Sequence, residues 1–161
     1  VCAGVLVGAA VTAGTQQPAQ ASASTTDRTE PRTPIANVVM MRLAIVGSTE
    51  FERDEPARQK AKVLIHESLI EWEPKVVISG GALGIDLLAK IVAEGLGIEV
   101  IEHLPKNRRW EPDGYKARDI LIAQDCTHML CIRYHASKTY GSGWTADEAE
   151  RLGKVVERHV I

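Results

Sequence analysis

Cysteine is scarce in this sequence, and the few that occur are poorly spaced for a cross-linked or metal-bound fold. The three cysteines stand at positions 2, 126 and 131, so they form neither an even set for a disulfide framework nor the paired CxxC clusters of a zinc site. We therefore expect a reducing, cytoplasmic environment and no bound metal. Cys126 and Cys131 are expected to be small buried apolar residues.

A strong charge of either sign is also missing. The formal net charge is -2 and the sequence pI is about 6.2, so no broad basic field covers the protein. Tight, sequence-independent binding to duplex nucleic acid depends on many basic contacts and has no support from this composition. Lys106, Arg108, Arg109 and Trp110 are a local exception that combines cations with an aromatic ring. Such a loop can rim a phosphate or base site, contact a single strand, or simply be solvated.

The first 39 residues differ in composition from the rest. Residues 1–14 are small and apolar but too few to span a bilayer, so we expect no membrane association. Residues 15–34 are rich in Thr, Gln, Ser, Ala and Pro, which disfavours a packed core. Because no basic residue precedes the apolar run, we expect residues 1–39 to be a disordered leader or an upstream extension, with a secretion signal as the alternative. One domain is expected over residues 40–161, starting at the methionines before the first strand.

From residue 42 onward, short β-branched runs alternate with longer segments of helical period, which is typical of βαβ units. We expect strands at residues 43–46, 75–78, 98–101, 127–132 and 155–161, and helices at residues 54–72, 87–96, 115–125 and 145–152. Right-handed crossovers would build these into an α/β three-layer Rossmann-like sandwich. Its sheet would be five-stranded and mostly parallel, with about four helices.

Glycine and serine follow three of the expected strands. Gly47 and Ser48 follow the first, residues 79–84 the second, and residues 141–143 the fourth. In an open parallel sheet the carboxyl ends of the strands share one edge, and ligands bind in the crevice beyond it. Glycine lets the backbone approach a ligand, and the N-terminus of the next helix offers unpaired N–H groups suited to phosphate. We therefore expect a nucleotide-sized ligand at this edge and no further cofactor, with simple turn formation as the alternative, above all at Gly47 and Ser48.

The segment 79–84 matches neither of two common phosphate-binding motifs. It lacks the GxGxxG pattern, and no Gly-Lys-Ser/Thr follows as in a P-loop, so ATP hydrolysis has little support. Asp86 lies in the first turn of the next helix, where it either matches the helix charge or contacts a ribose hydroxyl. The expected nucleotide-binding residues are Gly47, Ser48, Ser79, Gly80, Gly81, Gly84, Asp86, Arg133, Gly141, Ser142, Gly143 and Thr145.

Three segments, in their order along the chain, resemble the SLOG superfamily. They are IVGS at residues 45–48, VISGGALGID at residues 77–86 and GSGWTADE at residues 141–148. This superfamily joins the DNA-processing Smf/DprA proteins, the cytokinin-activating LOG phosphoribohydrolases and many small bacterial and phage domains that look closest to this chain. The resemblance spans about residues 41–161. It implies a Rossmann-like nucleotide-binding domain, and a homodimer, because relatives often complete their sites by dimerisation.

The resemblance also implies an activity. LOG-type enzymes release a free base from a nucleoside monophosphate, using an arginine in the third helix and a glutamate in a GGxGTxxE motif. Arg118 and Glu148 match these two positions and would be the catalytic pair, Arg118 holding the phosphate and Glu148 stabilising charge on the ribose. Ser142 replaces the second glycine of that motif and Trp144 stands where the third is expected, so a large indole would reshape or narrow the phosphate site. Binding is therefore better supported than hydrolysis.

Several alternatives stay open. A sensor that binds a nucleotide without turning it over is favoured by Trp144, and a single-stranded DNA-binding module is favoured only by the loop at 103–110 and opposed by the acidic pI. Arg118 and Glu148 could instead be ordinary charged residues of helix surfaces. His103 and His135, each following a strand at the ligand edge, could contact the ligand or act as acid or base, or could be solvated.

Overall fold

The computed structural model of this protein describes residues 40–51 and 53–161. The expectations for the leader, including the secretion signal and Cys2, concern residues 1–39 and lie outside the described residues. Within the described part of the chain, no helix is both long enough and apolar enough to cross a membrane.

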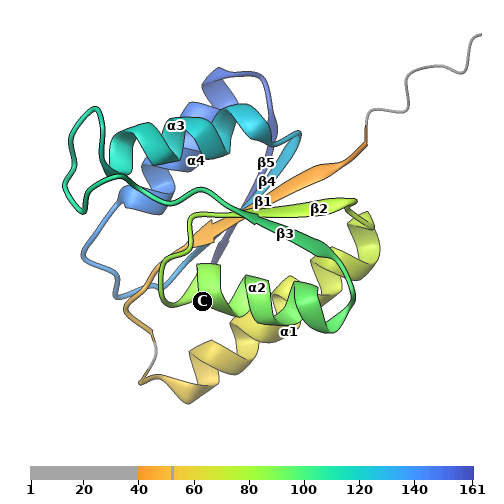
Figure 1. The fold of residues 1–161 in the computed structure, drawn as a ribbon. Coiled ribbons are helices and arrows are strands. Elements are labelled where there is room, and N and C mark those ends of the chain that lie inside the picture. Colours follow the sequence, from red (N-terminus) through yellow and green to blue (C-terminus); the bar gives the residue numbers. More distant parts are fainter. Residues whose placement is uncertain (1–39, 52) are drawn as a thin grey trace, which may run out of the picture. The chain divides into compact units, whose positions relative to one another are not determined.

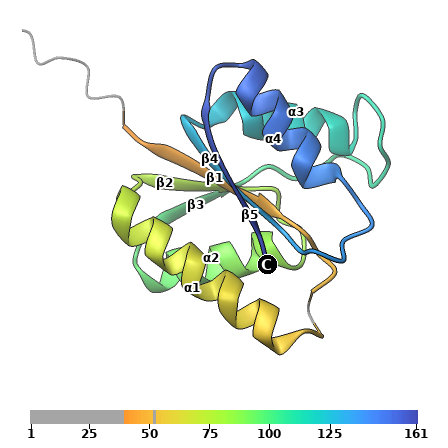
Figure 2. The ribbon, with the colours of Figure 1, turned by 180° about the vertical axis from the view of Figure 1, so that it is seen from behind.

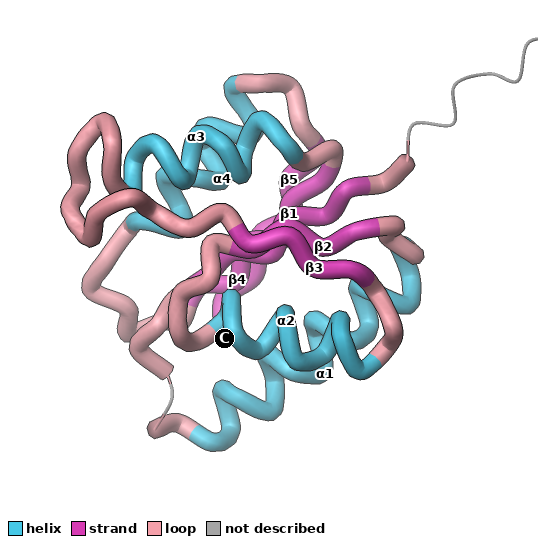
Figure 3. The backbone as a smooth tube through the Cα atoms, viewed as in Figure 1, coloured by secondary structure: helices cyan, strands magenta, loops and turns pink. Residues whose placement is uncertain are grey.

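Five strands form a single sheet in which all neighbours run parallel (Figures 1 and 3). The strands are β1 (Arg42–Gly47), β2 (Val76–Ser79), β3 (Glu99–Glu102), β4 (His128–Arg133) and β5 (Val155–Val160). Their order across the sheet is β3-β2-β1-β4-β5, so the sheet grows in one direction from β1 to β3 and in the other from β4 to β5. The predicted five-stranded Rossmann-like architecture is confirmed, and its sheet is parallel throughout.

Two pairs of helices cover the two faces of the sheet, which makes the three layers seen in Figures 1 and 2. Helices α1 (Glu55–Trp72) and α2 (Ile85–Gly95) lie on one face, and α3 (Tyr115–Asp125) and α4 (Gly141–Arg151) lie on the other. The helices divide between the two faces because the chain adds β2 and β3 on one side of β1 and then β4 and β5 on the other. Right-handed crossovers that run to opposite sides of β1 place their helices on opposite faces of the sheet.

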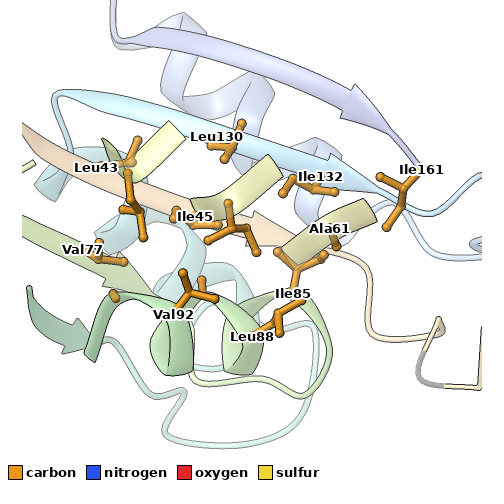
Figure 4. Packing of buried hydrophobic residues seen from close by; sticks show 14 of the residues in the cluster. Leu43, Ile45, Ala61, Val77, Ile85, Leu88, Val92, Leu130, Ile132 and Ile161 are labelled. Carbon is orange, nitrogen blue, oxygen red and sulfur yellow. The ribbon is translucent and has the colours of Figure 1, made fainter. Parts of the chain in front are cut away.

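The central strands are buried on both faces, as parallel strands covered by helices must be. In β1, Leu43 and Ile45 pack with α1 and α2, while Ala44 and Val46 pack with α3 and α4. Figure 4 shows the first of these layers, in which Ile85 and Leu88 of α2 meet the sheet. Cys126 and Cys131 are free and buried in the second layer, as expected.

Helix α1 starts at a side-chain cap that also ties it to the strand end of β4. The carboxylate of Asp54 accepts a hydrogen bond from the backbone N–H of Ala57 (3.1 Å) and one from the hydroxyl of Tyr134 (2.9 Å). Capping oxygens of this kind satisfy N–H groups that have no partner inside the helix. The cap therefore fixes where the loop after β1 ends.

Helix α4 begins earlier than the sequence pattern indicates. The pattern predicted a loop through residue 143 and a helix from Thr145, whereas the helix begins at Gly141. The backbone N–H of Trp144 donates to the carbonyl of Tyr140 (2.8 Å), which closes the first turn. Two glycines and a serine conceal a helix start because none of them favours helical conformation. As a result, the N-terminus of α4 lies directly at the carboxyl end of β4.

Candidate functional site

A crevice opens at the carboxyl ends of β1 and β4. These neighbouring strands mark the point at which the strand order reverses, because the chain adds β2 and β3 on one side of β1 and β4 and β5 on the other. Such topological switch points are where open α/β sheets bind their ligands, since the loops on the two sides diverge. We call this cavity the switch-point compartment; its volume is about 450 Å³. It is lined by Val46, Gly47, Thr49, Ala82, Asp86, Trp110, Tyr115, Arg118, Asp119, Ile122, Thr139, Gly141, Ser142 and Thr145.

A second cavity adjoins the first on the side of β2 and β3. We call it the loop compartment, because the glycine-rich segment 80–83 and the segment 104–108 line most of it, and its volume is about 680 Å³. Thr49, Ala82, Tyr115 and Arg118 line both compartments, so the two cavities meet along these residues. Together they form one crevice of sufficient size for a nucleotide.

Arg118 occupies the boundary between the compartments. It lies in the first turns of α3, which brings its side chain beneath the glycine-rich segment and leaves it only 13% exposed. Its Nη1 donates to the carbonyl oxygen of Gly80 (2.9 Å), and its guanidinium lies 5.2 Å from the centre of the Tyr115 ring. A Cβ at Gly80 would collide with Nη1 of Arg118, so any side chain here would displace the end of the arginine from the carbonyl it contacts. Both residues therefore lie in the crevice wall, and the reason for the glycine is the close approach of the arginine.

The glycine-rich segment uses its own N–H groups internally. The N–H groups of Gly80 and Ala82 donate to Oδ2 of Asp86 (3.2 and 3.3 Å), and that of Gly81 donates to the hydroxyl of Ser79 (3.2 Å). A phosphate cradle would need these groups to point toward a ligand. Two of the backbone N–H groups of this segment therefore bind the carboxylate of Asp86 and are not available to a phosphate.

Asp86 is nearly buried and keeps one oxygen free. The residue is 5% exposed and lines the switch-point compartment. While Oδ2 accepts the two loop N–H groups, Oδ1 makes no hydrogen bond with any described residue. Burial raises the pKa of this carboxyl to about 6, against the attraction of the nearby Arg118 guanidinium, which lowers it.

Asp119 adds a second buried carboxyl beside Arg118. Its Oδ1 lies 2.6 Å from Nε of Arg118, close enough for an ion pair, although neither atom is aligned for a hydrogen bond with a described residue. Burial raises the pKa of Asp119, and Arg118 opposes that rise. Two carboxyl groups therefore share one guanidinium in the wall of the switch-point compartment, which leaves the compartment without an excess of positive charge.

Aromatic rings form another part of the wall. Trp110 lines the switch-point compartment and is half exposed, and its ring meets that of Trp144 edge-on with centroids 5.1 Å apart. Trp144 itself does not line either compartment. The indole that was expected to narrow the phosphate site therefore packs against Trp110 instead.

The first turn of α4 closes the compartment from the β4 side. Gly141, Ser142 and Thr145 line it, and the hydroxyl of Thr145 donates to the carbonyl of Gly141 (3.0 Å). The first N–H groups of a helix have no partner within it, so this end of α4 offers donors to a ligand. Gly143 lies instead against the ring of Tyr140, which a Cβ would strike.

Other residues predicted for the site have structural contacts elsewhere. Ser48 is buried, and its hydroxyl accepts the N–H of Tyr134 (3.0 Å), whereas its neighbour Thr49 lines both compartments. Gly84 has a positive φ of 78°, and a Cβ there would collide with the carbonyl of Ser48, so it serves the turn before α2. The guanidinium of Arg133 lies 5.1 Å from the centre of the Tyr140 ring, and Arg133 lines neither compartment.

Glu148 is not brought together with Arg118 in the crevice. It lines neither compartment, and Arg151 holds its carboxylate through two hydrogen bonds (2.8 and 2.6 Å). That contact lowers the pKa of Glu148. The two loop histidines also point elsewhere, since His103 contacts Asp125 (2.9 Å) and His135 contacts the carbonyl of Ile161 (3.0 Å).

Several residues that the motifs did not identify belong to the crevice, among them Asp119, Thr49 and Tyr115. Asp119 directly follows the predicted Arg118, and Thr49 directly follows the predicted Gly47 and Ser48. A helical turn places neighbours about 100° apart, so sequence proximity alone does not tell which of two adjacent side chains faces the cavity. Tyr115 also lines both compartments from the start of α3.

Comparisons with known proteins bear on the fold. No protein-family model matches the chain, and no curated protein matches it. Among solved structures, the structural-genomics target TM1055 matches with 17% identity and a TM-score of 0.57 over 73% of this chain and 72% of that chain. A molybdenum cofactor carrier protein from Chlamydomonas reinhardtii matches with 16% identity and a TM-score of 0.57 over 76% of this chain and 78% of that chain.

DNA processing protein A from Streptococcus pneumoniae matches with 16% identity and a TM-score of 0.45, over 73% of this chain and 58% of that one. At identities this low, the likeness to TM1055 and to the carrier protein shows a shared fold. The likeness supports the Rossmann-like fold that the motif resemblance implied.

Proposed function

We propose that the crevice binds a nucleotide or nucleoside derivative. The observation that carries this proposal is the position of Arg118, whose guanidinium lies where an aromatic-walled compartment meets a basic one. Trp110 supplies a half-exposed ring on the first side, and Lys106 and Arg108 supply cations on the second. A nucleotide has the matching parts, a flat base that stacks on aromatic rings and a phosphate that binds cations.

Binding without turnover is the form of this function that the side chains support best. The carboxylate that the family resemblance assigns to catalysis, Glu148, is engaged by Arg151. One of the structures that share the fold is named as a carrier protein for a cofactor, which is a binding function. We therefore favour a nucleotide-binding or sensing role over hydrolysis.

Hydrolysis of an N-glycosidic bond is the second proposal for the same crevice. The reaction needs a carboxylate near the sugar to stabilise positive charge as the base leaves. Either Glu148 would have to leave Arg151, or one of the buried acids beside Arg118, Asp86 and Asp119, would have to take this role. The variants Glu148→Gln, Asp86→Asn and Asp119→Asn separate these routes, because only the variant at the acting carboxylate abolishes release of base.

The test is titration of the purified protein with AMP, CMP, GMP and UMP, followed by tryptophan fluorescence and calorimetry. We expect binding of at least one nucleotide with a change in emission, because Trp110 lines the cavity. Arg118→Ala should weaken binding about tenfold or more, through loss of a charged hydrogen-bond donor. Arg118→Lys serves as the second variant that keeps the charge, and Arg109→Ala is the control, since Arg109 is 77% exposed and lines neither compartment.

Chromatography of the same mixtures decides between the two proposals. Free base released from any nucleotide supports hydrolysis, and binding without release supports a sensor. Failure of all four nucleotides to bind overturns the proposed function. A shift of single-stranded DNA that weakens with salt would favour instead a nucleic-acid role for the basic loop.

We also propose, from the family resemblance, that the chain forms a homodimer. One chain has a mass of 17.5 kDa, so sedimentation distinguishes one copy from two. A single species of monomer mass over a wide concentration range would contradict this proposal.

A further inference from the structure

We propose that two copies of this chain associate through the free edge of β5, where the two β5 strands pair antiparallel across a twofold axis and join the two sheets into one. This inference rests on the proposed homodimer and adds the surface and the register through which it forms. Nucleotide binding in the crevice is a separate property and does not enter it.

Strand β5 presents a row of backbone groups on its outer side. It comes last in the strand order of the sheet, so no described strand lies beyond it (Figure 2). The N–H groups of Val155 and Ile161 donate to carbonyl groups on the side of β4. Because the backbone groups of successive residues in a strand alternate in direction, those of Val156, Arg158 and Val160 point outward. Such an edge is a template for a further strand.

The side chains of β5 do not protect this edge. Val155 and Val160 are 57% and 61% exposed, and the strand contains no proline. Edge strands that must stay unpaired usually carry lysine, proline or a bulge. Beside the edge, a groove of about 420 Å³ runs between α1 and the end of β5, with Val63 and Leu64 of α1 in its wall. Exposed apolar side chains next to outward backbone groups are typical of a surface that another chain covers.

A second copy fits this edge because the strand is complementary to itself. A twofold axis perpendicular to the sheet keeps every side chain on its own face, so the same patch meets itself in both copies. With Arg158 on the axis, Val156 lies opposite Val160 of the second copy, and Glu157 lies opposite His159 of the second copy. This register also places the outward backbone groups of one strand opposite those of the other, as an antiparallel ladder requires.

The charges on the α1 side of the sheet favour this register. Within one copy His159 contacts Glu157, so the two side chains lie on the same face. Lys60 of α1 lies near them, since its Nζ is 3.4 Å from the carbonyl oxygen of Val160. Glu157 of the second copy would therefore approach both the imidazole of His159 and the ammonium group of Lys60. Opposite charges at facing positions stabilise a strand pair.

The arginines on the axis do not oppose the pairing. Asp147 and Glu150 of α4 hold the guanidinium of Arg158 at 2.8 and 3.1 Å, so two acids of the same copy compensate each positive charge. An axis at Glu157 would instead place two glutamates directly opposite each other, and like charges at facing positions destabilise a strand pair. The axis at Arg158 is therefore the better of these two neighbouring registers.

The first experiment measures the dissociation constant of the dimer by sedimentation of the full chain over a wide concentration range. Val160→Lys places a charge in the contact with Val156 twice per dimer, and we expect it to raise the dissociation constant about tenfold or more. Ile91→Lys is the matched control, because Ile91 is 54% exposed but lies on α2, away from β5. It should leave the dissociation constant unchanged.

The outcomes separate the two proposals. If the unmodified chain sediments as a monomer at every concentration, the proposed homodimer fails and this inference fails with it. If the unmodified chain is a dimer that Val160→Lys leaves intact, or that Ile91→Lys disrupts instead, only the assignment to β5 is overturned. Circular dichroism confirms that both variants are folded.

The second experiment tests the register by disulfide formation. Arg158→Cys is made in a chain that also carries Cys2→Ser, because the native Cys126 and Cys131 are buried. Facing residues of a hydrogen-bonded antiparallel pair have Cα atoms about 5.5 Å apart, which a disulfide spans. Val155→Cys in the same background is the control, since three residues on each side of the axis separate its two copies by about 20 Å.

Mild oxidation should give a covalent dimer from Arg158→Cys, which a reductant reverses, and none from Val155→Cys. Both positions are exposed, so the thiols are accessible in the monomer and both variants are expected to fold. A dimeric Arg158→Cys that forms no disulfide, or a covalent dimer from Val155→Cys, overturns the antiparallel register centred on Arg158.

Discussion

Replacing Asp86 by asparagine should stabilise the protein at neutral pH. The buried carboxyl has a pKa of about 6 in the folded protein against a usual value of 3.8. That difference corresponds to about 3 kcal/mol of free energy by which folding disfavours the ionised form at pH 8. Asparagine resembles the protonated acid in shape and still offers an oxygen to the N–H groups of Gly80 and Ala82. Because its amide N–H₂ needs a partner of its own, which costs about 1 kcal/mol or more, we expect a smaller gain of about 1 to 2 kcal/mol.

The direction of the pH dependence follows from the raised pKa. The protonated carboxyl favours the folded state, so its contribution is fully present below pH 3.8 and is lost as the pH rises through about 6. Asparagine has no such titration. The difference in free energy of unfolding between Asp86→Asn and the unmodified protein should therefore be small near pH 4, grow between pH 4 and 6, and stay constant above pH 7.

Urea unfolding of both proteins at intervals from pH 4 to pH 8 measures this difference. Groups elsewhere, including Asp119, titrate in both proteins, so the difference isolates Asp86 to a first approximation. Asp113→Asn is the matched control, since Asp113 is an exposed acid of the loop before α3. A folded Asp86→Asn that is less stable than the unmodified protein at pH 8, or a difference that does not change with pH, would refute the argument that this carboxyl is buried at a cost.

Three further predictions concern neighbouring positions. Gly80→Ala should displace the flexible end of Arg118 and weaken nucleotide binding about tenfold with little change in melting temperature. Gly95→Ala is the control, because a Cβ at Gly95 meets nothing within 4 Å. Unaltered binding by Gly80→Ala would contradict the role given to this glycine. Asp54→Ala should lower the free energy of unfolding by about 1 to 2 kcal/mol through loss of the α1 cap, measured by urea unfolding, and a loss below about 0.3 kcal/mol would show that the cap contributes little. Trp144→Ala removes the ring that contacts Trp110 edge-on and should weaken binding of any nucleotide severalfold, as measured by calorimetry. Unchanged affinity would mean that Trp110 keeps its position without this contact.

The alternation of strands and helices could be predicted from the sequence because it depends on local patterns. Runs such as that of β1 are apolar on both faces, and the helical period of α1 places Ala61, Ile65 and Leu69 toward the sheet. These patterns recur every few residues and need no knowledge of distant contacts. Parallel strands joined by right-handed crossovers then leave few topologies, so the ligand edge could also be predicted.

The residues of the crevice were predictable only in part. Of the residues named from the motifs, Arg118, Gly80, Asp86 and Gly141 lie in its wall, since they sit at or near the ends of strands or the starts of helices on that edge. The start of α4 was missed because glycine gives no local signal for a helix, and the helix there is held by packing on β4. Ser48 and Arg133 share the edge but turn toward neighbouring loops.

What each polar side chain contacts was decided by the tertiary structure alone. The sequence by itself determined that glycines, an arginine and acids would meet at one edge of a parallel sheet, because the order of strands and helices carries them there. It did not determine that the loop N–H groups bind Asp86, that Arg118 fills the space left by Gly80, or that Glu148 pairs with Arg151. Each of these contacts depends on the rotamer of a side chain and on a partner from another turn or element, so no local pattern in the sequence predicts it.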